Sequence, residues 1–367
     1  MELLNTFSEL TDPRTKRITY SLELIIFLTI SSVVSGAENW TDVANFSKSK
    51  IDWVKKFYPD LKKTPSHDTF GDFFKRLEPD EFSKVFIKWV SQICNITEGE
   101  LIAIDGKKLR GSYDNEDGKA AIHIINVWAS ENELVLGQKK VDSKSNEITA
   151  IPELLKVLEI KGAVISIDAM GCQKEIAKDI IEQGADYVLA LKKNQKELFL
   201  QVESSFESNT AVVSEYKEVT KGHGRIETRI CKQINDLKFI EESCKWKGIK
   251  SVIRIESTRY NITKDKEENE IRYYISSLDI SAKKMLSYIR GHWHIENKLH
   301  WQLDVNFKED DSRIRKGHGD QNFSLIRKIA LNLLKADKEI KKSIRAKMKM
   351  AGWNDETREL LLQIIRK

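Results

Sequence analysis

The sequence has few cysteines. Among its 367 residues only Cys94, Cys172, Cys231 and Cys244 occur, far apart and with no CxxC pair. This pattern argues against a zinc ribbon and against a disulfide framework. We therefore expect a protein of the reducing cytoplasm. The chain also has no fixed-period repeat and no low-complexity tract, and its 40% hydrophobic content is typical of a globular protein with two or three domains.

Long hydrophobic runs are missing as well. The longest one near the N-terminus, residues 24–34, follows Glu23 and contains Thr29, Ser31 and Ser32. It is well short of the roughly 20 apolar residues that cross a bilayer, and no convincing signal-peptide cleavage site follows it. We interpret this run as a buried helix, and we expect no membrane partner.

An excess of positive charge is concentrated in one segment. The formal net charge of the whole chain is only +5, but residues 308–349 contain 13 Lys and Arg against 6 Asp and Glu. A localised basic surface favours a polyanion such as nucleic acid. The alternative is a solvated helix face, which is the commoner origin of a charge run.

Hydrophobic periodicity divides the chain into segments. Apolar residues recur at helical spacing in the first 97 residues, and the period changes to that of strands at Leu101. Strand patterns return between about 212 and 279, and basic helices are expected from 322 to 350. The predicted domains are an all-helical N-terminal domain (1–97), the first part of a catalytic core (98–211), a β-rich insertion (212–279), the second part of the core (280–335) and a basic helical tail (336–367).

The order of elements in the core predicts a fold class. Three strands are followed by a helix, a strand, a helix and a strand, which is the order of an α/β domain where an antiparallel meander precedes crossover-linked parallel strands. Ribonuclease H-like folds are built in this way. In such a sheet the first and fourth strands lie side by side.

Three acids occupy distinctive positions. Asp105 and Asp168 each end a short apolar strand, and Glu296 is the only carboxylate between Ser281 and Leu303, where we expect it within the apolar stripe of a helix. Adjacent strands would bring Asp105 and Asp168 together, and the helix after the insertion would add Glu296. Carboxylates suit Mg²⁺ or Mn²⁺, and two such ions can assist both ends of an in-line displacement at phosphorus. We therefore expect a catalytic site with two divalent ions.

Each acid also has a purely structural interpretation. An Asp after a strand is often a turn residue or a helix N-cap, and Glu296 could pair with Arg290 or Lys298. Other acids compete for the third position, but they follow the helix in a charged stretch and we expect them to be solvated. These are Asp304, Glu309, Asp310 and Asp311.

Histidines and tryptophans cluster around Glu296. His292, Glu296 and His300 are spaced four residues apart, as zinc ligands on one helix could be, but no HExxH string occurs and we disfavour zinc. Trp293 and Trp301 are interpreted as core residues, with stacking on a displaced base as the alternative.

Basic and polar residues stand close to each acid and along the insertion, as a polyanionic substrate would require. The predicted DNA-binding residues are Lys107, Arg110, Lys192, Lys193, Asn194, Arg225, Arg229, Arg290, His292, Trp293, Asn297 and Lys298.

Three strings resemble a known family. They run from Ala103 to Ser112 (AIDGKKLRGS), from Ile167 to Gln173 (IDAMGCQ) and from His292 to Val305 (HWHIENKLHWQLDV). They are similar to those of the DDE insertion-sequence transposases of the ISAs type, which include the H-repeat-associated proteins. The likeness covers nearly the whole chain and extends to the N-terminal helices, to residues 192–195 and to residues 223–229.

The resemblance implies a catalytic triad of Asp105, Asp168 and Glu296 on a ribonuclease H-like core. It implies a bacterial, nucleoid-associated enzyme that acts as a dimer on the inverted-repeat ends of its own element and on target DNA. A broader group of these enzymes has Arg four residues before the Glu and Lys seven after it, and here His292 and Leu303 stand there. Two other functions stay open, a metal-dependent nuclease without strand transfer and an inactive DNA-binding remnant.

Overall fold

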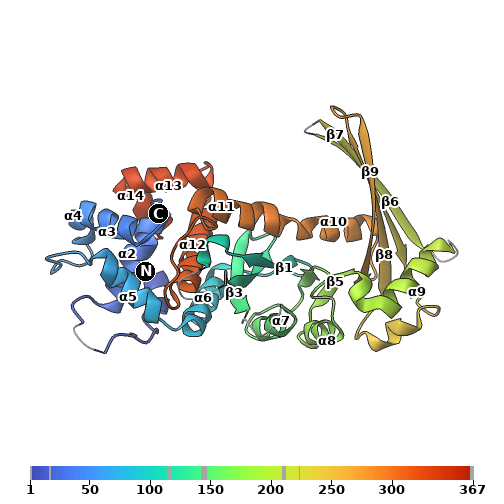
Figure 1. The fold of residues 1–367 in the computed structure, drawn as a ribbon, viewed down its shortest axis with the longest axis horizontal. Coiled ribbons are helices and arrows are strands. Elements are labelled where there is room, and N and C mark those ends of the chain that lie inside the picture. Colours follow the sequence, from blue (N-terminus) through green and yellow to red (C-terminus); the bar gives the residue numbers. More distant parts are fainter. Residues whose placement is uncertain are drawn as a thin grey trace.

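The computed structural model describes residues 2–15, 18–113, 118, 120–141, 147–208, 212–222 and 224–363. His223, which the family resemblance includes, lies outside these residues. The molecule is elongated, with helices gathered around both chain ends and one sheet running away from them (Figure 1).

Helices form the N-terminal part, as the apolar spacing predicts. They are α1 (Glu2–Phe7), α2 (Leu22–Val34), α3 (Trp40–Ser49), α4 (Ile51–Val54), α5 (His67–Arg76) and α6 (Pro79–Ile93). Helix α2 begins where the Ser21 side chain accepts a hydrogen bond from the Leu24 N–H, which satisfies one free N–H group of the first turn. Nearly all of α2 is buried, so the interpretation of this run as a buried helix is confirmed. Among the described residues no helix has the length and apolar character needed to cross a membrane.

The central strands follow the predicted order. They are β1 (Leu101–Lys108), β2 (His123–Ala129), β3 (Leu134–Val141), β4 (Val164–Ile167) and β5 (Asp186–Leu191). Strand β1 pairs antiparallel with β2 and parallel with β4, so the first and fourth strands do lie side by side. Helices α7 (Glu147–Leu155), α8 (Lys174–Glu182) and α9 (Lys196–Glu207) connect or follow these strands.

The insertion continues the same sheet. Its strands are β6 (Ser214–Gly222), β7 (Arg225–Ile234), β8 (Ser251–Asn261) and β9 (Lys266–Ser276). Because β9 pairs antiparallel with β5, one nine-stranded sheet results, in the order β3-β2-β1-β4-β5-β9-β8-β7-β6. Figure 1 shows these long strands extending beyond the core. The β-rich character was predicted from the sequence, whereas the continuity of the sheet was not.

A long helical segment then returns to the core. It consists of α10 (Ala282–His292), the π-helical turn η4 (Ile295–His300) and α11 (Trp301–Phe307). The predicted apolar stripe is confirmed, since Met285, Ile295, Leu299 and Leu303 are all buried. The π turn is shown by the Trp301 N–H, which donates to the carbonyl of Glu296, five residues earlier. Such wide turns are rare and occur often at functional sites. Short 3₁₀ turns are η1 (Arg110–Ser112), η2 (Lys193–Gln195) and η3 (Glu241–Lys245).

The C-terminal helices are α12 (Gly319–Ala336), α13 (Ile344–Trp353) and α14 (Asp355–Leu361). Helix α12 is buried along most of its length and packs against α2, α5, α6 and β3. Asn332 bonds both backbone groups of Val135 on β3. The expectation that 322–350 is a basic surface is wrong for α12, because Arg327 and Lys328 are buried in the core. The exposed cations of this region follow α12 instead.

Candidate active site

Two of the three predicted acids lie beside each other on neighbouring strands. Asp168 directly follows β4 as expected, but β1 continues to Lys108, so the expectation that Asp105 ends its strand is wrong. The parallel pairing of β1 with β4 ends at Ile104 and Ile167, so Asp105 and Asp168 are the next residue on each strand. Adjacent strands are roughly 4.8 Å apart. The sheet therefore brings these carboxylates to the same edge although 62 residues lie between them in the chain.

Asp168 also shapes the loop that follows β4. Its Oδ1 accepts hydrogen bonds from the backbone N–H of Met170 at 3.0 Å and of Gly171 at 3.4 Å. The turn interpretation of this residue is therefore correct as a local description. The Asn194 side chain, which we expected to contact DNA, donates to the carbonyl of Ala169 at 2.8 Å. Residues from the end of β5 thus fix the loop that carries Asp168.

Glu296 approaches Asp105 from the π turn. Oxygen atoms of Asp105 and Glu296 and a ring nitrogen of His300 all lie within 4.8 Å of one another. His300 Nδ1 is 2.8 Å from Glu296 Oε2 and 3.8 Å from Asp105 Oδ2. The Glu296 side chain is 55% exposed, so it lies beside the buried stripe and not within it as expected. Its neighbours Ile295 and Leu299 occupy the buried positions.

Burial and neighbouring charge act in opposite directions on the two carboxylates. Burial, together with the charge of Asp168, raises the pKa of Asp105 to about 6, although His300 and the Gly106 N–H act against it. The pKa of Glu296 is lowered, chiefly by the hydrogen bond from His300. Asp105 is therefore a carboxylate whose ionisation is opposed by its surroundings, and a bound cation would favour its charged form.

His300 was not among the predicted catalytic residues. The ring is buried, and its Nε2 accepts a hydrogen bond from the Asn126 side chain at 3.2 Å, which leaves the proton on Nδ1 for donation to Glu296. Asn126 is the cross-strand partner of Asp105. The sequence carried a signal for this residue, since His300 follows Glu296 by four positions.

The zinc arrangement considered from the same spacing does not form. His292 Nδ1 lies 3.0 Å from the hydroxyl of Ser166, and burial lowers the pKa of this imidazole. Asp105, Glu296 and His300 make up the one group of possible metal ligands among the described residues. The two carboxylates of this group suit a divalent ion such as Mg²⁺ or Mn²⁺, whereas the imidazole is a ligand type that zinc also accepts.

A second pair of a carboxylate and an imidazole lies near Asp105. Glu147 Oε1 is 2.9 Å from His123 Nε2, and both groups occupy the space that a side chain at position 106 would need. A Cβ atom on Gly106 would come within 2.1 Å of Glu147 and 2.4 Å of His123. Glycine at this position therefore lets these groups approach the backbone beside Asp105.

Lys107, predicted to bind DNA, is buried in an ion-pair network. Its ammonium contacts Asp304, Glu309 at 3.2 Å and Asp310 at 3.8 Å. Glu309 is also 3.7 Å from Lys328 Nζ. The expectation that Glu309 is solvated is wrong: burial opposes its ionisation, but the charges of Lys328 and Lys107 outweigh burial and hold the pKa of Glu309 at about 2. This network joins β1 to the segment after α11 and to α12.

The other predicted DNA-binding residues fall into two groups. Arg229, Arg290 and Lys298 form ion pairs with Glu227, Glu218 and Glu133. The second group is exposed to solvent. Within the described residues only one of its members, Arg110, has a close carboxylate, with its Nε 3.6 Å from Asp310. Its members are Arg110, Lys192, Lys193, Arg225 and Asn297.

The tryptophans of this segment are not core residues, which corrects that interpretation. Trp293 is 50% exposed and Trp301 is 54% exposed. The guanidinium of Arg272 on β9 lies 5.4 Å from the Trp293 ring centroid, whereas Trp301 has no comparable contact in the described part of the chain. An indole face is therefore open to solvent one turn beyond Glu296.

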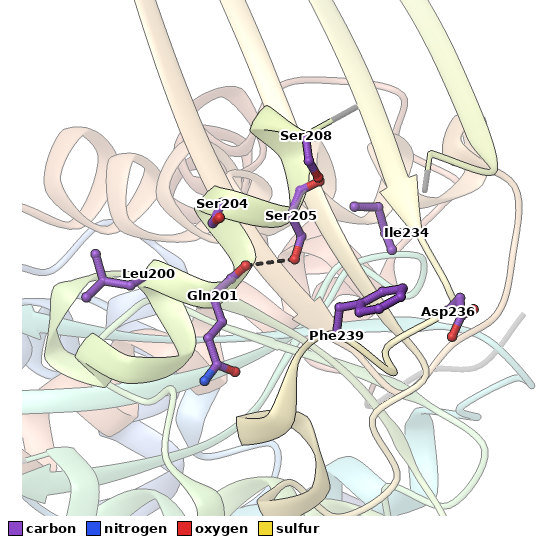
Figure 2. A pocket seen from close by; sticks show the side chains of 8 residues that line it. All are labelled: Leu200, Gln201, Ser204, Ser205, Ser208, Ile234, Asp236 and Phe239. Carbon is purple, nitrogen blue, oxygen red and sulfur yellow. Dashed lines mark hydrogen bonds between the residues drawn. The ribbon is translucent and has the colours of Figure 1, made fainter. Parts of the chain in front are cut away.

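A hollow in the protein surface lies beside the β-rich insertion, away from the acids. Residues of α9 and of the segment after β7 line it, including Leu200, Gln201 and Phe239, as Figure 2 shows. Phe239 is 81% exposed. None of the predicted site residues lines this hollow, so it is separate from the carboxylate cluster.

Comparison with known proteins identifies the family. The model described as "Transposase DDE domain" matches residues 96–333, and the model described as "DDE_Tnp_1-associated" matches residues 4–90. The chain therefore belongs to the transposase DDE domain family.

Individual relatives agree with the predicted resemblance. The chain is 43% identical to the "H repeat-associated putative transposase YhhI" of Escherichia coli, with 96% of this chain and 95% of that protein covered. It is also 43% identical to the E. coli protein YbfL, over 92% of this chain and 90% of that one. A solved structure of the piggyBac transposase synaptic complex with hairpin DNA matches with a TM-score of 0.46 and 12% identity, over 99% of this chain and 77% of that chain.

Proposed function

We propose that this protein is an active DDE transposase with a ribonuclease H-like core, β1–β5. Its catalytic residues are Asp105, Asp168 and Glu296. The observation that carries the proposal is the convergence of Asp105 and Glu296, whose oxygens lie within 4.8 Å although 190 residues separate them in the chain. The pairing of β1 with β4 supports the inclusion of Asp168. Family membership supports DNA as the substrate.

Asp105 and Glu296 fit a divalent ion, Mg²⁺ or Mn²⁺, and we propose that Asp168 completes a site for two such ions. The metal-binding atoms that these residues offer are mostly carboxylate oxygens, which Mg²⁺ and Mn²⁺ both prefer. The raised pKa of Asp105 indicates negative charge that the protein itself leaves uncompensated. When bound, the ions supply charge stabilisation to the attacking and leaving oxygens. His300 positions Glu296 through its Nδ1 proton.

The proposed reaction has two steps. In the first, a water oxygen attacks a phosphorus at the end of the element, the bond from phosphorus to the 3′ oxygen breaks, and a free 3′ hydroxyl results. In the second, that hydroxyl attacks a phosphorus of target DNA, and a target 3′ oxygen leaves. An element is moved only when both of its ends are cleaved and joined to one target, so we propose a homodimer that holds the two ends together.

The test begins with single acid variants. Asp105→Ala, Asp168→Ala and Glu296→Ala are each expected to lower Mg²⁺-dependent cleavage of element-end DNA at least a thousandfold while DNA affinity stays within about threefold. Asp311→Ala is the matched control, an acid of the same region to which this mechanism gives no role. Cleavage at the wild-type rate by any of the three variants would remove that residue from the proposed triad.

A second assay separates a transposase from a nuclease. Wild-type protein is given an element end with a ready-made 3′ hydroxyl, together with a supercoiled plasmid as target. Joined products are expected if the protein performs strand transfer. Cleavage of the uncut end without any joined product would instead identify a nuclease, and no metal-dependent turnover in either assay would identify an inactive remnant.

A further inference from the structure

A groove beside the helix that carries Glu296 has an unusual lining. It has a volume of about 540 Å³ and lies between α11, the end of α12 and the start of α13. Trp301 and Val305 of α11 form one wall. Lys338, Lys342 and Arg345, which follow α12 in the chain, also line the groove. Trp301 and Val305 belong to the third family string and the three cations to the basic segment 308–349, but none of these residues is among the predicted DNA-binding residues.

The charges within the groove do not cancel. Its two carboxylates are already paired, Glu133 with Lys298 and Lys335, and Asp337 with Lys347. Lys338, Lys342 and Arg345 are exposed, and none of them has an ion pair within the described residues. The groove therefore presents three uncompensated cations. Such a surface attracts a polyanion, and no ion pair within the protein has to break when the polyanion binds.

The aromatic wall adds a second requirement on the ligand. The Trp301 ring is more than half exposed and lies next to Val305, which is also exposed. An exposed indole beside cations matches a nucleic acid strand, since phosphates bind the cations while a base or sugar packs on the ring. An acidic protein segment would satisfy the cations but not the aromatic face.

The position of the groove relates it to the acids. Trp301 follows Glu296 by one π turn, and the Trp301 N–H donates to the Glu296 carbonyl. Lys298, between the two, pairs with the same Glu133 that lines the groove. A DNA strand in the groove would therefore lie along the helix that carries the acid.

We propose that this groove binds a DNA strand, with phosphates on Lys338, Lys342 and Arg345 and a base or sugar against Trp301. The proposal rests on the proposed function for the identity of the substrate. It extends that function by assigning a strand-binding surface outside the carboxylate cluster.

The test measures DNA binding without chemistry. Every protein carries Asp105→Asn, and the probes are a fluorescein-labelled 30-base single strand of mixed sequence and the corresponding duplex, each titrated at several salt concentrations. The groove variant is Lys338→Gln/Lys342→Gln/Arg345→Gln. The matched control is Lys156→Gln/Lys161→Gln/Lys247→Gln, which removes the same charge from exposed positions beside α7 and before β4 and β8.

The groove variant is expected to weaken binding at least tenfold and to reduce the slope of log K against log salt by about two, since each phosphate contact contributes roughly 0.7–0.9. The control is expected to change the slope by less than one. Trp301→Ala is expected to weaken single-strand binding about tenfold with an unchanged slope, because stacking is not ionic. Circular dichroism melts of all variants report whether folding is intact.

Two results would overturn the proposal. One is equal loss of affinity in the groove variant and its control, which would show non-specific charge attraction. The other is unchanged DNA affinity with a lower mass by light scattering, which would show that this face binds a second copy of the chain. If the groove variant alone loses affinity while the wild-type protein cleaves no DNA, the proposed function fails and the groove assignment stands.

Discussion

At the scale of single residues, the site places several carboxyl groups close together, and their negative charges repel one another. Asp105 is close to the charges of Asp168 and Glu147 and is largely buried, and its pKa rises to about 6 as a result. In the unfolded chain the same group titrates near 3.8. The folded protein thus holds the Asp105 proton more tightly than the unfolded chain does. Ionisation of Asp105 therefore lowers the free energy of unfolding. This loss is complete above about pH 6 and absent below about pH 3.8.

Asp105→Asn is accordingly expected to stabilise the metal-free protein at pH 7.5. The pKa difference corresponds to a gain on the order of 1–3 kcal/mol, and the gain is expected to shrink at pH 4.5, where the folded wild-type carboxyl is mostly protonated. Urea unfolding in EDTA at both pH values measures it. Asp52→Asn, at a fully exposed acid, is the control. Greater stability of the wild type at pH 7.5 would contradict the assigned charge cluster.

The sequence indicates which acids to consider for the site, but it does not indicate their surroundings. Asp105, Asp168 and Glu296 stand out because each interrupts or ends an apolar pattern. Glu309 does not stand out, since it lies in a run of charged residues and its burial depends on Lys107 and Lys328 from other elements. No local pattern reports a partner that is about 200 residues away in the chain.

At the scale of elements, the Lys107 network fixes the end of β1 against the chain beyond the π turn that carries Glu296. The contacts of Lys107 join one strand to Asp304 on α11 and to Glu309, which in turn reaches Lys328 on α12. A buried ion pair adds little net stability compared with an apolar pair, but removing one partner leaves the other buried and uncompensated. The network therefore sets geometry more than it adds stability.

Lys107→Met is expected to lower the free energy of unfolding by about 3 kcal/mol, because the buried Glu309 keeps Lys328 but loses one of its two cationic partners. Lys108→Met, at the exposed next residue, is expected to change it by less than about 0.5 kcal/mol. The double variant Lys107→Met/Glu309→Gln is expected to recover part of the loss, as a double-mutant cycle from denaturant melts shows. Additive effects of the two changes would mean that the pair is not coupled.

Element order was predictable because each strand and helix carries its own hydrophobic period. The alternation that marks β2 and β3 and the apolar runs of β4 and β5 gave the correct sequence of elements. The π turn was not predictable, since residues 295–300 read as an ordinary helix. Ile295 and Leu299 within it are buried, as they would be in an ordinary α-helix with the same apolar spacing, so burial alone does not mark the π turn.

At the scale of the whole molecule, the predicted domains share one core. Helix α12, expected in the catalytic core, packs against α2, α5 and α6 of the N-terminal part and also against β3. A single hydrophobic cluster contains residues from Phe7 to Leu362. Boundaries drawn from composition could not show this, because they depend on contacts between segments far apart in the chain.

We therefore expect the N-terminal helices and the central sheet to unfold together. Hydrogen exchange at increasing urea concentrations is expected to remove protection from α2, α5 and β1 at the same midpoint, since α12 packs against both helices and against β3 of the same sheet as β1. The tip of the β8–β9 hairpin, which is exposed, serves as the control for local opening. Loss of protection in α2 and α5 at clearly lower urea than in β1 would show an independent N-terminal domain.

The π turn has a consequence for how this chain tolerates changes in length. An α-helix advances about 100° per residue, so α10 and α11 are held in their relative rotation by the width of the turn between them. Deleting one residue from 295–300 would leave α10 in place and swing Asp304 away from Lys107 and Trp301 out of its groove. Residues 295–300 therefore tolerate a substitution more readily than the deletion or insertion of a residue. A relative with a deletion or insertion in this stretch would have different residues next to Glu296.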